Sequence, residues 1–217
     1  MEKPNLARKA LMLRALIRGT YAIESASGNK IMTALKQLDQ CGLDFELILK
    51  QTPNYLQAYL FRAEIYFNAL AQNPDGFLRL GGRTNAIGLL HIIYEDLMRV
   101  LAPSDNAQAF LLRAQVELLE LFLNRKRAVK KEGMDLARRC QEDAKKGAAF
   151  DPARSRYLVL AGQFFEFENT PPRDRPQSYR DLHQNLKQHL EKHPELASDQ
   201  SNFFLREIES ILETDQD

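Results

Sequence analysis

Helical periodicity is clearest around Pro53. The four residues that fall on one helical face after this proline are Tyr59, Arg62, Ala63 and Tyr66, at positions i, i+3, i+4 and i+7. Three further residues lie 12, 8 and 5 positions before the same proline, namely Cys41, Phe45 and Ile48. The pattern predicts one helix that ends before Pro53 and another that begins just after it.

This arrangement recurs along the chain. The prolines Pro4, Pro53, Pro103 and Pro152 are separated by 49, 50 and 49 residues. A second motif repeats in phase with them, starting at Leu11, Tyr59 and Phe110, with a weaker copy at Tyr157. Each copy is predicted to form two helices, and Asp105 and Asp151 are suited to cap the first helix of the last two copies. We therefore expect an all-α protein built from four repeats.

The spacing resembles that of the tetratricopeptide repeat (TPR) family. Tyr59, Ala63 and Tyr66 match the aromatic, small and aromatic positions of the family's first helix, and residues 143–152 resemble its usual end. The resemblance covers residues 4–166. It implies a right-handed α-solenoid of four helix hairpins, in which the first helices line a concave groove.

The copies are longer than the ~34 residues of that family. We expect the extra residues between the helices of a pair, near residues 25–29, 73–82 and 125–133. Such long copies also resemble the repeat regions of some bacterial serine/threonine kinases and of accessory proteins of solute transporters. No kinase signature is present in this chain.

The end of the chain departs from the repeat. A proline-rich segment, 170–176, follows Phe164, Phe165 and Phe167, and two helices are predicted after it. Ser178 and Asp181 form a possible capping box for the first helix, and the second should end near Thr214. We divide the chain into repeats over 1–169 (about 4–52, 53–102, 103–151 and 152–169 onward), a connector over 170–176 and capping helices over 177–217.

Composition narrows the functional classes. The chain has 217 residues, 44% of them hydrophobic, which is enough for a large core. Its formal charge of +1 disfavours a dedicated nucleic-acid binder. No apolar run reaches membrane-spanning length, and the arginines near the N-terminus exclude a secretory signal. The two cysteines cannot form a disulfide scaffold, which favours a reducing, cytoplasmic location.

Arg14, Arg62 and Arg113 occupy equivalent positions in the first three copies. We expect each guanidinium to pair with an acid of the second helix, because Asp44, Asp96 and Asp143 lie 9, 7 and 9 residues before their prolines. The alternative is a row of arginines along the groove that binds carboxylates or phosphates.

Other candidate chemistry is sparse. Cys41 and Cys140 are expected to be small buried residues two repeats apart, too distant for a disulfide. His189 and His193 stand at i and i+4, but no further ligand completes a metal site, so a solvated helix face is expected. The basic run 125–131 is expected to be a solvated loop. Without a catalytic motif, we expect no enzyme, no cofactor and no metal.

The expected function is a non-catalytic scaffold that binds a peptide or partner helix in the groove. The groove residues that the family resemblance implies are Lys9, Gln57, Glu64, Gln108, Gln115 and Ser155. Tyr59 and Phe61 are expected in the core. One alternative is a small-ligand or lipid-handling accessory with a pocket near Phe164, Phe165 and Phe167. The other is a homo-oligomer that assembles through an exposed face of Leu6, Ala10, Leu13 and Ile17.

Overall fold

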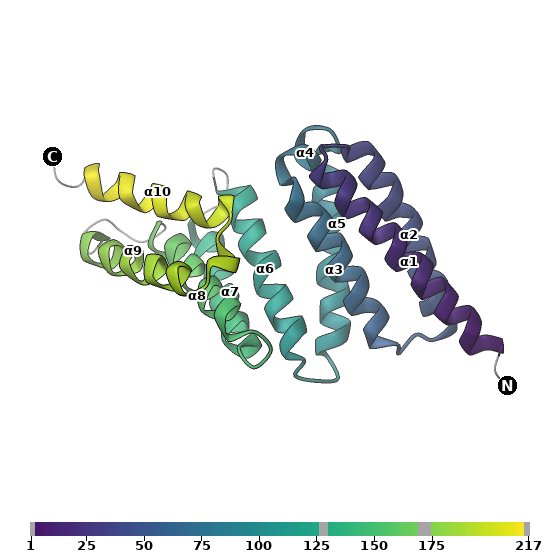
Figure 1. Cartoon of the computed structure of the whole chain (residues 1–217). Coiled ribbons are helices and arrows are strands. Elements are labelled where there is room, and N and C mark those ends of the chain that lie inside the picture. The colour runs from purple at the N-terminus through teal and green to yellow at the C-terminus, as the bar shows by residue number, and fades with distance from the viewer. Residues whose placement is uncertain (1–2, 126–129, 169–174, 215–217) are drawn as a thin grey trace. The chain divides into compact units, whose positions relative to one another are not determined.

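A computed structural model describes residues 3–125, 130–168 and 175–214 of the chain. These residues form ten α-helices and one short 3-10 helix, with no strand among them (Figure 1). Neighbouring helices pack against one another, so the all-α prediction is confirmed. The chain divides into two compact units, Met1–Asp105 and Asn106–Asp217. The division falls beside Pro103, where one predicted repeat ends and the next begins.

The first unit consists of two helix pairs. Its helices are α1 (Lys3–Ser27), α2 (Ile31–Gln51), α3 (Leu56–Gln72), α4 (Pro74–Arg79) and α5 (Gly82–Leu101). α1 packs along α2 and α3 packs along α5, and α3 also contacts both α1 and α2 (Figure 1). The extra length of the first pair lies mostly in its helices, since α1 has 25 residues and α2 has 21. In the second pair it includes the short helix α4.

Two turns of the first unit are joined by an asparagine pair. Asn29 connects α1 to α2 with a positive φ of 57°, a conformation that asparagine tolerates better than most residues. Asn73 follows α3, and its Oδ1 accepts the backbone N–H of Gly76 at 2.9 Å, which caps α4. Its Nδ2 donates to Asn29 Oδ1 at 3.0 Å. The two turns are therefore held together by side chains.

The second unit contains α6 (Ala107–Asn124), α7 (Lys130–Gly147), α8 (Pro152–Glu168), α9 (Arg175–Lys192), the 3-10 helix η2 (Pro194–Leu196) and α10 (Asp199–Thr214). α6, α7 and α8 pack on one another, α9 packs on α8, and α10 packs on α9. Asp151 caps α8 as predicted, because its Oδ1 accepts the N–H of Arg154 at 2.9 Å. The prediction for α6 was wrong: Asn106, not Asp105, provides the cap, accepting from Ala109 N at 3.0 Å.

Aromatic rings fill the space between α8 and the C-terminal helices. Phe164 lies 5.3 Å from Phe204 and 6.4 Å from Tyr179 between ring centroids, and Phe165 lies 5.7 Å from Phe204. Phe167 contacts Tyr179 at 5.8 Å. α9 and α10 thus cover the apolar residues of α8. The three phenylalanines that were considered as the lining of a ligand pocket pack against other aromatic rings.

Two details of the predicted C-terminal region differ in the structure. α9 begins at Arg175, so Ser178 lies within the helix and does not form the N-terminal capping box expected with Asp181. Residues 170–174 of the predicted connector lie outside the described residues, while its last two residues belong to α9. The predicted end of the last helix near Thr214 is confirmed.

Candidate functional site

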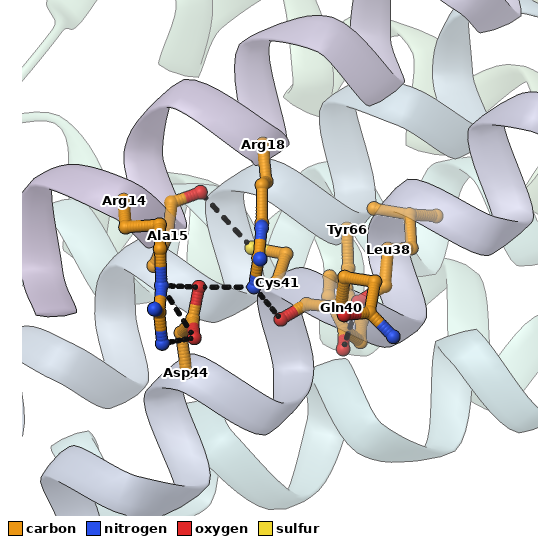
Figure 2. Close-up of polar contacts among 8 residues, drawn as sticks. All are labelled: Arg14, Ala15, Arg18, Leu38, Gln40, Cys41, Asp44 and Tyr66. Atoms are coloured by element: carbon orange, nitrogen blue, oxygen red, sulfur yellow. Dashed lines mark hydrogen bonds and ion pairs between the residues drawn. The ribbon is translucent and has the colours of Figure 1, made fainter.

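An ion pair between an arginine and a buried aspartate joins the two helices of each of the first three pairs. Arg14 Nη2 donates to Asp44 Oδ1 at 2.6 Å, between α1 and α2 (Figure 2). The corresponding distances are 2.7 Å from Arg62 to Asp96 and 2.8 Å from Arg113 to Asp143. All three aspartates are buried. The predicted pairing of the arginines is therefore confirmed.

The geometry of these pairs is bidentate. In each, the arginine Nε also donates to the same carboxylate, which gives two parallel hydrogen bonds and fixes the relative orientation of both side chains. Asp44 receives a second cation, because Arg18 Nη1 donates to its Oδ2 at 2.7 Å and to the carbonyl of Gln40 at 3.1 Å (Figure 2). The carboxylates thus occupy the donors that a bound anion would need, which disfavours the row of anion-binding arginines.

The cysteines join the helices of two of these pairs, α1 with α2 and α6 with α7. Cys41 Sγ donates to the carbonyl of Ala15 at 3.3 Å (Figure 2). Cys140 Sγ donates to the carbonyl of Ala114 at the same distance. Each accepting alanine directly follows the paired arginine. Both cysteines are free and fully buried, as expected for small packing residues. Burial raises the pKa of Cys41 to about 12, so its thiol stays protonated near neutral pH.

The second unit contains a buried carboxyl group that the sequence analysis missed. Glu117 lies 99 residues after Arg18, the same separation as between Arg14 and Arg113, so Glu117 and Arg18 occupy equivalent positions. This position supplies a second cation beside the ion pair in the first unit and a second acid in the second unit. Its Oε2 finds no hydrogen-bond partner among the described residues, and Arg139 Nε is 3.6 Å from Oε1. Burial, followed by the charge of Asp143, raises the pKa of Glu117 to about 8. The change from the basic Arg18 to the acidic Glu117 is visible when the sequences of the copies are aligned.

The predicted groove residues are divided between the units. In the first unit, Lys9 on α1 and Gln57 on α3 are exposed, and Glu64 on α3 is half-buried. α1 and α3 are in contact, so these residues lie on neighbouring helices of one compact unit. Tyr59 is buried, as expected of a core residue, and Phe61 is half-buried.

In the second unit, Gln108 and Gln115 are half-buried on α6. Ser155 on α8 is buried, and its Oγ donates to the carbonyl of Ala144 on α7 at 2.7 Å. It therefore has a structural role and is not accessible to a ligand.

A shallow hollow in the first unit was also missed. It is lined by Pro53, Asn54, Leu56, Tyr59, Arg99, Ala102 and Pro103. The Arg99 guanidinium stacks 5.3 Å from the centroid of the Tyr59 ring, and its Nη1 donates to the hydroxyl at 3.2 Å. The recurring prolines Pro53 and Pro103 both line the hollow, and their repetition is the sequence signal that could have indicated it.

Arg125 is not the solvated loop residue that the basic run predicted. Its Nη2 donates to Glu207 on α10 at 2.6 Å, and its Nε donates to Glu168 on α8 at 2.9 Å. Its guanidinium also lies 5.0 Å from the centroid of the Phe203 ring. Arg125 therefore links three helices of the second unit. Residues 126–129 of the run lie outside the described residues, and Lys130 begins α7.

The histidine prediction also needs correction. His189 is half-buried, and its Nε2 donates to the carbonyl of Ala153 at 2.8 Å, which links α9 to α8. His193 contacts Glu195. Within the described residues, no three or more histidine, cysteine, aspartate or glutamate side chains are grouped as metal ligands. None of the helices in that same part of the chain has the length and apolarity to span a membrane.

These contacts hold helices together, while Lys9 on α1 and Gln57 on α3 are exposed. No protein-family model, curated protein or solved structure matches this chain.

Proposed function

We propose that the chain is a non-catalytic protein–protein interaction module, a right-handed solenoid of TPR-like hairpins that binds a peptide or partner helix. The helix contacts support this architecture. In the first unit α3 packs on both helices of the preceding pair, and in the second unit α8 does the same. Stacking of each pair on the next is the organisation of repeat proteins.

Recurrence of the buried contacts supports the same proposal. The Arg14–Asp44 and Arg113–Asp143 pairs each span 30 residues, and the two cysteine contacts each span 26. The buried polar groups of these hairpins thus hold the helices together. Recognition is left to the side chains on the outside, which is how repeat proteins vary their partners on a constant framework.

One observation carries the binding proposal. Lys9 and Gln57 lie 48 residues apart at equivalent repeat positions, and both are exposed on helices that contact each other. An extended peptide or a helix laid across α1 and α3 would meet both side chains, with the half-buried Glu64 further along α3. The two unpaired cysteines fit a reducing compartment, and we place the protein in the cytoplasm.

Peptide binding can be tested by selecting ligands for the full chain from a random peptide library. Affinities for the selected peptides are then measured by fluorescence anisotropy. The double variant Lys9→Ala/Gln57→Ala should weaken binding at least tenfold. The matched control is Lys36→Ala/Gln51→Ala, which removes one exposed lysine and one exposed glutamine from α2. Failure to select a peptide, or equal effects of the two double variants, would overturn the proposal.

A further inference from the structure

The outer face of α1 carries a stripe of exposed apolar residues. Leu6, Leu13, Ile17 and Tyr21 are 72%, 61%, 62% and 56% exposed, and Ala10 between them is also exposed. Their spacing of three or four residues places all five on one side of the helix. We call these five residues the α1 stripe. Large apolar side chains gathered in this way usually mark an interaction surface.

The repeat shows what normally covers such a stripe. The residues of α3 that correspond to Ala10 and Ile17 are Ala58 and Ile65, 48 positions later, and both are buried. Ile65 packs directly on α1, since a Cβ added to Gly19 would lie only 2.7 Å from its Cδ1. This face of a first helix therefore receives a helix of a neighbouring hairpin. Among the described residues, no helix covers the α1 stripe in this way.

We infer that a second copy of this chain covers the stripe, with the two α1 helices packed antiparallel about a twofold axis. Four of the five stripe residues pair with one another in that arrangement, and the fifth, Leu13, lies beside the axis. Leu6 and Tyr21 are symmetric about a point between residues 13 and 14, and so are Ala10 and Ile17. Leu6 of one copy would thus meet Tyr21 of the other, and the small Ala10 would face the branched Ile17. A twofold interface requires this kind of self-complementarity.

Charges near the stripe permit this pairing. Arg14 and Arg18 flank it, and both are ion-paired with Asp44, which reduces the repulsion between two basic helices. Four large side chains, each more than half exposed, provide roughly 400–500 Å² of apolar surface. A standard interface buries about 800 Å² on each partner. The dimer should therefore be weak, with a dissociation constant on the order of micromolar.

Sedimentation velocity of the full 24.9 kDa chain over about 1–300 μM tests the inference. The wild-type chain should shift from monomer to dimer, and 0.5 M salt should not weaken the dimer because its contacts are apolar. Leu13→Glu should keep the chain monomeric at every concentration. The control is Leu80→Glu, which changes a residue of the same unit that is 62% exposed and lies outside the stripe. Circular dichroism checks that both variants remain folded.

A cross-linking experiment tests the antiparallel arrangement directly. The native cysteines are buried, so new surface cysteines can be oxidised selectively. A mixture of Ala10→Cys chains and Ile17→Cys chains should form the mixed disulfide at least tenfold faster than either variant forms its own. A wild-type chain that stays monomeric, a dimer that survives Leu13→Glu, or cross-linking without preference for the mixed pair would each overturn the inference.

Discussion

Removing Arg62 gives the sharpest test of the ion-pair framework. Asp96 is 1% exposed and receives two hydrogen bonds of 2.7 Å from Arg62, whose own side chain is 14% exposed. Arg62→Leu would leave this carboxylate buried without its partner. Breaking a buried pair in this way costs about 3–5 kcal/mol, which compares with a total stability of about 5–15 kcal/mol for a typical domain. We expect a loss at the lower end, because Arg99 lies close enough to offset part of the charge.

The matched comparison is Arg14→Leu. Arg14 is 52% exposed, and its partner Asp44 keeps a second bond from Arg18 at 2.7 Å. This variant should therefore lose clearly less stability than Arg62→Leu. The double variant Arg62→Leu/Asp96→Leu should recover most of the loss, because replacing both charges with apolar side chains removes the stranded carboxylate.

Urea unfolding followed by circular dichroism at 222 nm measures these differences. The two units can unfold separately, so the curves should be fitted with two transitions and the change assigned to the one affected. The loss of stability caused by Arg62→Leu should be larger at pH 7 than at pH 4. Without its partner, the buried Asp96 would have a raised pKa, so the folded variant would lose stability as the pH rises towards that pKa. A neutral Arg62→Leu, or one no worse than Arg14→Leu, would refute a structural role for this pair.

Three further variants test a buried carboxyl group of the second unit and the packing at two glycines. Burial raises the pKa of Glu117 from its usual 4.5 to about 8, so the wild-type chain should lose stability as the pH rises between these values. Glu117→Gln should have little effect on stability at pH 4 and should raise it by up to about 5 kcal/mol at pH 9 in urea titrations. Equal effects at both pH values would contradict this. Gly147→Ala should destabilise by about 1–3 kcal/mol, because the new Cβ would lie 2.8 Å from Leu111 Cβ. At Gly88 an added Cβ meets nothing within 4 Å, so Gly88→Ala should stabilise the protein by up to about 1 kcal/mol. Thermal melts in which Gly147→Ala and Gly88→Ala shift the melting temperature in the same direction would refute the packing argument.

The sequence predicted the helix pairs and their internal contacts well, because a constant period fixes which residues face each other. Asp44, Asp96 and Asp143 stand at nearly constant distances before their prolines, so each could be assigned to the arginine of its own copy. The equivalence of Cys41 and Cys140 was found in the same way. Contacts within a hairpin depend on local spacing, which a single sequence displays.

Contacts that depend on distant segments could not be predicted. Arg125 stands in a basic run, and its partners Glu168 and Glu207 lie 43 and 82 residues away. Ser155 was assigned to the groove by resemblance, but close packing of α8 on α7 brings its hydroxyl to the carbonyl of Ala144. The charge reversal at Glu117 was visible in the sequence. Its burial became evident only once α6 and α7 were placed together.

The aromatic cluster under the C-terminal helices decides where the chain can be cut. A fragment that ends near residue 169, at the proline-rich segment, would remove Tyr179 and Phe204 and leave Phe164 and Phe165 facing water. Newly exposed aromatic surface of this kind promotes aggregation. The segment that looks most like a linker is therefore a poor place to shorten the protein. Fragments for expression should be separated between Asp105 and Asn106, where each piece keeps its own core.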